Sequence, residues 1–220
     1  MRAEQPGAVP GADKGVNDRA RQVRLLAMDV DGVLTDGSVI YGAGGMEMEV
    51  KAFNVRDGLG IALARSAGLA VAWLTGRRSE AVDRRGSELR VDAVLQGVRN
   101  KGVTLCELAQ RRGLGMSEVA FIGDDINDLP ALRLVGLAVA PADAAAAARE
   151  AAHYVTAAPG GRGAVRETIE LVLRAQGRLE IAQEAYLESL AAAARRMLSK
   201  QRGAGDVTAT EEGAEDPGVG

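Results

Sequence analysis

The chain has 220 residues, of which 47% are hydrophobic, with a formal net charge of -3 and a single cysteine. This length predicts one folded domain with extensions, and the single cysteine excludes an internal disulfide. The charge balance and the 3% aromatic content argue against a nucleic-acid partner. With no apolar window long enough for a bilayer and no signal-peptide stretch, we expect a cytoplasmic protein without a membrane partner.

An apolar run at Leu25–Met28 leads directly into Asp29 and Asp31, and Gly32 follows. The run predicts a buried strand, and because burying an unpaired carboxylate is costly, both aspartates must emerge at its end. Side chains alternate along a strand, so the two aspartates share a face. Close carboxylates repel unless a cation compensates, which suggests a divalent metal such as magnesium. The competing interpretation is a strand that ends in an ordinary Asx turn.

Two short runs, 38–41 and 46–53, flank a glycine-rich link, and the second run alternates apolar and charged residues. This pattern predicts a β-hairpin with one solvated face, which is either a flap over the site or an ordinary edge hairpin. Asp57 then has the position of an N-cap, and we expect a helix from Ile61 to Ala67.

The next buried strand, expected at 69–74, ends in Thr75, and a helix from Glu80 to Leu89 follows. A hydroxyl, free N–H groups and a helix dipole converge there, which suits an anion, although Thr75 could simply cap a turn. After a short strand at 93–95, Lys101 opens a helix expected at 103–111. A lysine at that end opposes the dipole preference for acids, which hints at function.

A further apolar strand, expected at 117–122, ends in a loop that contains Asp124, Asp125 and Asp128. Three acids in five positions suggest a second site for a hard cation, with an acidic solvated turn as the alternative. Farther along, a strand is expected at 136–140, a helix at 144–152, an edge strand at 153–156 and a helix at 164–176. The alternation of strands and helices predicts an α/β fold, a parallel sheet with helices on both faces.

In a parallel sheet the polar groups that follow the strands lie at one edge. Two acidic clusters, the Thr75 hydroxyl and Lys101 would therefore meet in one crevice. Acids can hold a divalent metal, and metal, lysine and hydroxyl together can hold a phosphoryl group. One carboxylate can attack phosphorus, and a second can protonate the leaving oxygen and then activate water.

The stretch from Asp29 to Thr35 resembles the first motif of the haloacid dehalogenase (HAD) superfamily of phosphatases. Thr75, Lys101 and the loop 123–128 match its second, third and fourth motifs in order. The resemblance implies a Rossmann-like HAD fold with Asp29 as nucleophile and Asp31 as general acid/base. It implies that Asp29, the Asp31 backbone carbonyl and Asp124 bind Mg²⁺, that Thr75 and Lys101 hold the phosphoryl group, and that Asp125 and Asp128 support the site, with Asp128 placed to orient Lys101.

Additional segments, including 53–60, 75–78, 96–97 and 160–167, resemble the family of 3-deoxy-D-manno-octulosonate (KDO) 8-phosphate phosphatases. The resemblance implies a β-hairpin flap in place of a cap domain, a homotetramer, and a sugar-acid phosphate as substrate. It also implies a role in lipopolysaccharide precursor synthesis. Candidate ligands for the substrate carboxylate or phosphate are Arg56, Arg78 and Arg162.

The sequence thus predicts four regions. Residues 1–20 form a disordered N-terminal arm, and 21–177 form the HAD-like phosphatase domain. Residues 178–200 form an additional C-terminal helix, and 201–220 form a disordered acidic tail. This C-terminal extension departs from the family, which usually stops near residue 178.

Two alternatives stay open on the sequence. The first is a phosphatase for a nine-carbon keto-sugar acid 9-phosphate, as in sialic-acid-type metabolism. The second is a non-catalytic, phosphate-binding oligomeric module, which an Asn or Ser in place of Asp29 would have favoured.

Overall fold

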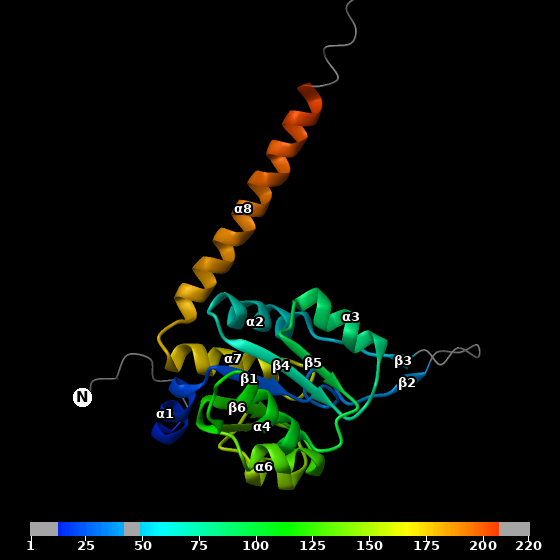
Figure 1. The fold of residues 1–220 in the computed structure, drawn as a ribbon, viewed down its shortest axis with the longest axis vertical. Helices are drawn as coiled ribbons and strands as arrows, with labels where there is room; N and C mark the ends of the chain where they lie inside the picture. Colours follow the sequence, from blue (N-terminus) through cyan, green and yellow to red (C-terminus); the bar gives the residue numbers. More distant parts are fainter. Residues whose placement is uncertain (1–12, 42–48, 207–220) are drawn as a thin grey trace, which may run out of the picture. The chain divides into compact units, whose positions relative to one another are not determined.

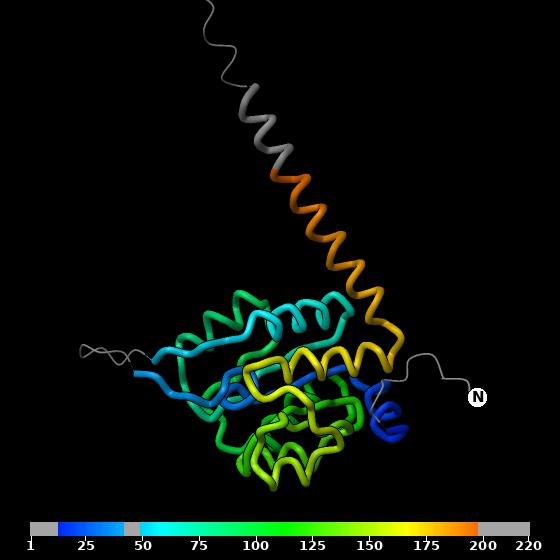
Figure 2. The backbone as a smooth tube through the Cα atoms, turned by 180° about the vertical axis from the view of Figure 1, so that it is seen from behind, coloured from blue at the N-terminus to red at the C-terminus, as the bar shows by residue number. Residues whose placement is uncertain are grey.

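The computed structural model describes residues 13–41 and 49–206 and has a six-stranded, all-parallel sheet at its centre (Figures 1 and 2). The strand order is β5-β4-β1-β6-β7-β8, with β1 paired to both β4 and β6. This is the α/β fold that the sequence predicted. The strands are β1 (Leu25–Met28), β4 (Ala70–Thr75), β5 (Ala93–Gln96), β6 (Val119–Ile122), β7 (Leu137–Ala140) and β8 (Tyr154–Val155).

Helices cover both faces of this sheet, so its central strands are buried on both sides (Figure 1). On one face α7 contacts both α1 and α2, and on the other α5 contacts both α4 and α6. Continuous apolar strands are what such double burial requires. The helices are α1 (Lys14–Gln22), α2 (Val55–Ser66), α3 (Glu80–Leu89), α4 (Lys101–Arg111), α5 (Leu129–Leu132), α6 (Ala146–Ala151), α7 (Ala164–Ala175) and α8 (Leu179–Asp206). None of the described helices is long and apolar enough to cross a membrane.

The N-terminal arm is shorter than expected, because residues 14–22 form helix α1. Asp13 caps the helix by accepting the N–H of Val16 at 2.8 Å. Val16 and Ala20 are buried, and α1 packs against α7. The prediction of disorder up to residue 20 is therefore wrong from residue 14 onward. The Asp13 cap and tertiary packing together stabilise this polar helix. Residues 1–12 lie outside the described part of the chain.

Helix α2 begins at Val55 rather than at the expected Ile61, and its N-cap is Asn54 rather than Asp57. Asp57 instead lies buried in the first turn, where its carboxylate accepts the N–H groups of Gly163 at 3.2 Å and Arg166 at 2.8 Å. These bonds tie α2 to the start of α7. The sequence suggested a local cap, whereas the partners of Asp57 are about a hundred residues away.

The hairpin is present at its base, where β2 (Ile40–Tyr41) pairs antiparallel with β3 (Glu49–Val50). The second strand was expected to run to Phe53 but ends at Val50. Residues 42–48, which include the start of that predicted strand, lie outside the described residues.

The described residues up to Ala182 form one compact unit, and those from Gln183 onward form a second. Leu179 and Ala182, at the start of α8, are buried in the first unit. The helix continues to Asp206, beyond the expected end at 200, so residues 201–206 are helical rather than part of a disordered tail. Residues 207–220 lie outside the described part.

We expect Asp57→Ala to lower the free energy of unfolding by about 1–3 kcal/mol, because it leaves buried N–H groups of the α7 terminus without an acceptor. Urea denaturation followed by circular dichroism measures this. Asp83→Ala is the matched control, since Asp83 is exposed in the first turn of α3. Equal losses in the two variants would contradict the anchoring role of Asp57.

Candidate active site

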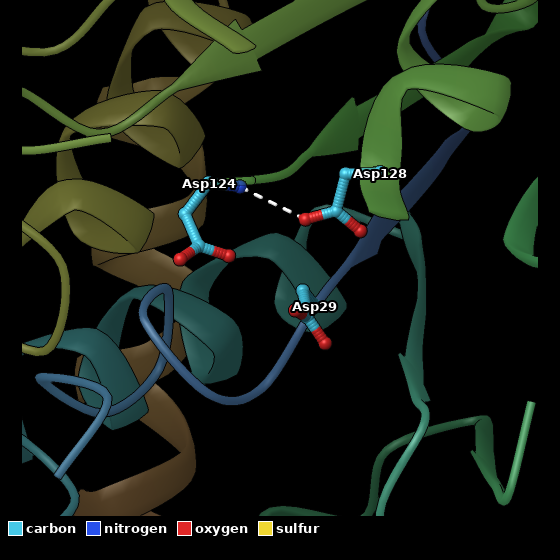
Figure 3. Close-up of side chains that lie close together, drawn as sticks. All are labelled: Asp29, Asp124 and Asp128. Carbon is cyan, nitrogen blue, oxygen red and sulfur yellow. Dashed lines mark hydrogen bonds between the residues drawn. The ribbon is translucent and has the colours of Figure 1, made fainter. Parts of the chain in front are cut away.

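Five of the predicted site residues meet at the carboxyl edge of the sheet. Asp29 directly follows β1 and Thr75 is the last residue of β4, while Lys101 opens α4 after β5. Asp124 and Asp128 follow β6. Because parallel strands present these ends on one side, side chains far apart in sequence become neighbours. Figure 3 shows Asp29, Asp124 and Asp128 converging from these segments.

Lys101 is the central cation of this cluster and is only 2% exposed. Its Nζ lies 2.7 Å from Asp29 Oδ2 and 2.5 Å from Asp128 Oδ1. Burial by itself would lower the pKa of Lys101, but the charges of Asp29 and Asp128 outweigh burial and raise that pKa above its ordinary value. Lys101 therefore stays positively charged. Its contact with Asp128 is the one that the predicted orienting role of Asp128 requires.

Asp128 also organises the loop after β6. It is fully buried, and its Oδ2 accepts the backbone N–H of Asp124 at 2.9 Å (Figure 3). The close approach leaves no room at Gly123, where a Cβ would lie 2.5 Å from Asp128 Cβ. Asp125 is exposed, and its Oδ1 accepts the N–H of Ile126 at 2.7 Å.

Two carboxyls of the cluster resist ionisation. Burial, and then the charge of Asp128, raise the pKa of Asp29 from 3.8 to about 6, although Lys101 acts in the opposite direction. Burial, together with Asp29 and Asp128, raises the pKa of Asp124 from 3.8 to about 8. One lysine does not compensate three acids, so the cluster has an excess of negative charge that a divalent cation would offset.

The geometry of the cluster fits a metal ion. One ligand atom from each of Asp29, Asp124 and Asp128 lies within 4.8 Å of the others. Of the three, Asp128 is already held by Lys101 and by backbone N–H groups. The Asp124 carboxylate lies against Gly32, where a Cβ would come within 2.1 Å of its Oδ2. Asp29 and Asp124, beside the backbone that follows β1, are thus the better placed oxygen donors.

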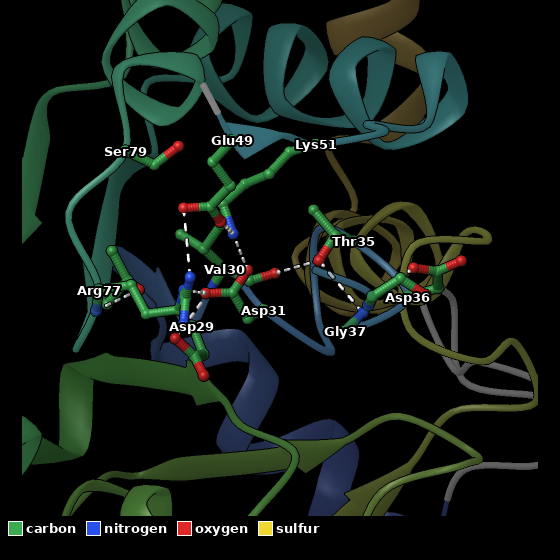
Figure 4. Close-up of polar contacts among 12 residues, drawn as sticks. Asp29, Val30, Asp31, Thr35, Asp36, Gly37, Glu49, Lys51, Arg77 and Ser79 are labelled. Atoms are coloured by element: carbon green, nitrogen blue, oxygen red, sulfur yellow. Dashed lines mark hydrogen bonds and ion pairs between the residues drawn. The ribbon is translucent and has the colours of Figure 1, made fainter. Parts of the chain in front are cut away.

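Asp31 contacts a different set of charges, at the base of the hairpin (Figure 4). Its Oδ1 pairs with Lys51 Nζ, and its Oδ2 lies 4.0 Å from Arg77 Nε. Glu49 joins the two cations, with Oε1 2.6 Å from Lys51 Nζ and Oε2 3.3 Å from Arg77 Nη2. We call these four residues the hairpin-base ring.

An open cavity of about 270 Å³ lies above the cluster. Thr75 is buried at its wall, and its Oγ1 accepts the N–H of Arg77 at 3.3 Å. The polar lining and the carboxyl-edge position suit a small polar ligand, and because four aspartates line the cavity an anionic ligand would need a bound cation beside it. The lining residues are Asp29, Asp31, Thr75, Gly76, Arg77, Asp124, Asp125, Ile126 and Asn127.

The three predicted substrate arginines, Arg56, Arg78 and Arg162, are exposed, and the cavity lining formed by the described residues includes none of them. Arg162 lies near the loop after β1, where hydrogen bonds from Ser38, and more weakly the charge of Arg162, lower the pKa of Asp36. The arginine that does line the cavity is Arg77.

Sequence reasoning missed Glu49, Lys51 and Arg77 as site residues. The signal was present for two of them, because Glu49 and Lys51 alternate with apolar residues and lie on one face of the hairpin. That face was interpreted as solvated. Its contact with Asp31 depends on how the hairpin folds back, which no local pattern encodes.

The relatives that sequence comparison finds are described as hydrolases or, more specifically, phosphatases. The family described as haloacid dehalogenase-like hydrolase matches residues 79–167. The 3-deoxy-D-manno-octulosonate 8-phosphate phosphatase KdsC of Escherichia coli K12 is 44% identical over 165 residues, covering 75% of this chain and 87% of the relative. The phosphatase of the same name from Yersinia pestis is 46% identical over 171 residues, covering 78% and 90%.

Solved structures of phosphatases have the same fold as this chain. The 3-deoxy-D-manno-octulosonate 8-phosphate phosphatase of Moraxella catarrhalis, in complex with a magnesium ion, a phosphate ion and KDO, has a TM-score of 0.75 at 39% identity. That match covers 78% of this chain and 97% of the other. The cobalt-bound phosphatase of Haemophilus influenzae has a TM-score of 0.72 at 36% identity, covering 77% and 99%.

The raised pKa values of Asp29 and Asp124 predict how stability depends on pH. In the metal-free state the folded chain holds these protons more tightly than the unfolded chain, whose aspartates titrate near 3.8. Stability is therefore lost as the pH rises from about 4 through 6 to 8. Asp124→Asn removes one such group, so we expect the chelator-treated variant to melt above wild type at about pH 8.

The difference in melting temperature between Asp124→Asn and wild type should shrink as the pH falls toward about 5. Each 1 kcal/mol of unfolding free energy corresponds to roughly 2–4 °C for a chain of this size. Circular dichroism melts across the pH range measure it, with Asp83→Asn as the exposed control. A gap that does not change with pH would count against the raised pKa of Asp124.

Proposed function

The chain belongs to the haloacid dehalogenase-like hydrolases, within the family of 3-deoxy-D-manno-octulosonate 8-phosphate phosphatases, and we propose that it hydrolyses KDO 8-phosphate to KDO and phosphate. The observation that carries this proposal is the pairing of a buried Asp29, held by Lys101, with a second carboxylate, Asp31, at the same cavity. A nucleophile and a proton donor side by side are what phosphate-ester cleavage through a covalent intermediate needs.

In this mechanism a carboxylate oxygen of Asp29 attacks phosphorus. The bond from phosphorus to the sugar oxygen breaks, and Asp31 donates its proton to that oxygen, so the sugar acid leaves as an alcohol. Asp31, now a carboxylate, takes a proton from a water molecule, whose oxygen attacks the aspartyl phosphate. The bond between phosphorus and Asp29 then breaks and releases phosphate, which regenerates Asp29. Thr75 and Lys101 hold the phosphoryl oxygens throughout.

The acidic cluster fits Mg²⁺, which Asp29, the Asp31 backbone carbonyl and Asp124 would hold. When bound, the ion offsets the negative charge of the carboxylates and of the substrate phosphate. Asp128 keeps Lys101 aimed at Asp29, and Asp125 supports the loop after β6. The excess of acid over base in the cluster supports this assignment.

Arg56, Arg78 and Arg162 remain proposed ligands of the substrate carboxylate or phosphate. All three are exposed, and Arg162 lies in a loop that packs on the segment after β1, since Gly161 N donates to Val33 O at 2.9 Å. We propose that they bind the part of the substrate that extends beyond the cavity. Because the described cavity lining includes none of them, they suit recognition of the distal end of a sugar acid.

We further propose that the protein is a cytoplasmic homotetramer that serves lipopolysaccharide precursor synthesis. Apolar side chains of the hairpin support the assembly, because Val39, Ile40, Tyr41 and Val50 are exposed. Exposed apolar groups gathered on one small element are typical of a surface that packs against another subunit.

Phosphate release from a substrate panel tests the proposed function. We expect strong preference for KDO 8-phosphate over nine-carbon keto-sugar acid 9-phosphates and hexose phosphates. Activity should disappear with EDTA and return with Mg²⁺, because the acidic cluster requires a counter-ion. Preference for a nine-carbon acid would keep the mechanism but change the substrate. No release from any member would favour a binding module.

Asp29→Asn should lower kcat by about 10³-fold or more, because the amide cannot act as the nucleophile. The change is nearly isosteric, so the circular dichroism spectrum should be unchanged. Asp125→Asn, on the exposed loop, serves as a comparison and should cost much less. Substantial activity in Asp29→Asn would rule out the covalent mechanism.

A further inference from the structure

Lys51 is a buried cation that the mechanism above does not use. It follows β3 at the base of the hairpin, and its side chain has no exposed surface. A buried lysine destabilises a fold unless acids compensate its charge. Lys51 has two such partners, Asp31 and Glu49. Although burial opposes its charge, the hydrogen bonds to Asp31 and Glu49 raise the pKa of Lys51, so it stays protonated.

The hairpin-base ring places a cation on the side of each oxygen of Asp31. Lys51 Nζ contacts Oδ1, while Arg77 Nε lies 4.0 Å from Oδ2. Figure 4 shows Lys51 and Arg77 approaching Asp31 from different segments, the hairpin and the loop after β4. The hydrogen bond from Lys51 to Oδ1 restrains rotation of the carboxyl group, and the Arg77 charge adds an attraction at Oδ2. Asp31 and Arg77 line the cavity, whereas Lys51 does not.

Glu49 completes the restraint. It lies between the two cations, 2.6 Å from Lys51 Nζ and 3.3 Å from Arg77 Nη2, and its side chain is 13% exposed. Two acids and two bases thus form a closed ring. The ring links the loop after β1, the hairpin and the loop after β4, so the position of Asp31 depends on the hairpin.

We propose that Lys51 is a positioning residue, which fixes the Asp31 carboxyl in the orientation required for proton transfer to the leaving oxygen, and that Glu49 holds Lys51 in place. This inference rests on the proposed function, in which Asp31 is the general acid. The alternative is that Lys51 only attaches the hairpin to the domain. The two roles differ in which substrates they affect.

Lys51→Met separates these roles, because it removes the charge but keeps an unbranched apolar side chain. A sugar phosphate has an alcohol leaving group that needs a proton, whereas p-nitrophenyl phosphate has a leaving group that departs without one. General acid catalysis contributes about 10²–10⁴-fold. We therefore expect kcat/KM for the sugar phosphate to fall roughly 10–100-fold and kcat/KM for p-nitrophenyl phosphate to change less than about 3-fold.

A double-mutant cycle identifies the residue through which Lys51 acts. In an Asp31→Asn background, Lys51→Met should have no further effect on the sugar phosphate, because the group that it positions is already absent. Lys14→Met is the matched control, since Lys14 is an exposed lysine of α1 and its loss should leave both substrates unaffected.

Equal losses with both substrates, or a sugar-phosphate kcat/KM within about 3-fold of wild type, would overturn the positioning role. So would additive effects of the two substitutions. The test of Lys51 does not require KDO 8-phosphate as the substrate. If wild type does not cleave KDO 8-phosphate, the proposed function fails. The kcat/KM values of Lys51→Met and wild type are then compared with the alkyl phosphate of the panel that wild type does cleave.

Discussion

Repulsion among carboxylates at one edge of the sheet is the constraint on which the rest of the site depends. The parallel sheet brings Asp29, Asp124 and Asp128 together, and burial makes their mutual charge expensive. Lys101 offsets part of that charge and is itself kept protonated by it. The remaining deficit of positive charge is what makes the cluster suited to a divalent cation, which would in turn offset the charge of a phosphate group. The repulsion that lowers the stability of the metal-free fold is thus the same feature that favours binding of a cation at this edge.

The strands can present these acids because their interior is uniformly apolar. Central strand β1 is buried along its whole length, and helices cover both faces of the sheet (Figure 1). Its backbone ladder continues through Asp29, whose N–H donates to Ile122 O at 2.9 Å. The nucleophile candidate is therefore attached to the buried, hydrogen-bonded centre of the sheet. Such an attachment suits a side chain that must meet phosphorus at one fixed geometry.

The described base of the hairpin contacts the loop after β1 through charged side chains. Glu49 and Lys51 form the ring with Asp31 and Arg77. Charge thus links Asp31, the proposed proton donor, to the hairpin. A second link of this kind joins α2 to the loop that carries Arg162, through Asp57 and the N–H groups of Gly163 and Arg166.

The sequence by itself determined the parallel α/β fold and the polar residues at the ends of its strands, because apolar runs that stop at Asp29, Thr75 and Asp124 are local signals. The motif order was also sufficient to indicate the family. The tertiary structure alone decided the contacts of Lys51 and Asp57, the packing of α1 against α7 and the exposure of Arg56 and Arg78. These depend on contacts between distant segments, and a charged or polar residue looks the same in sequence whether it faces water or a buried partner.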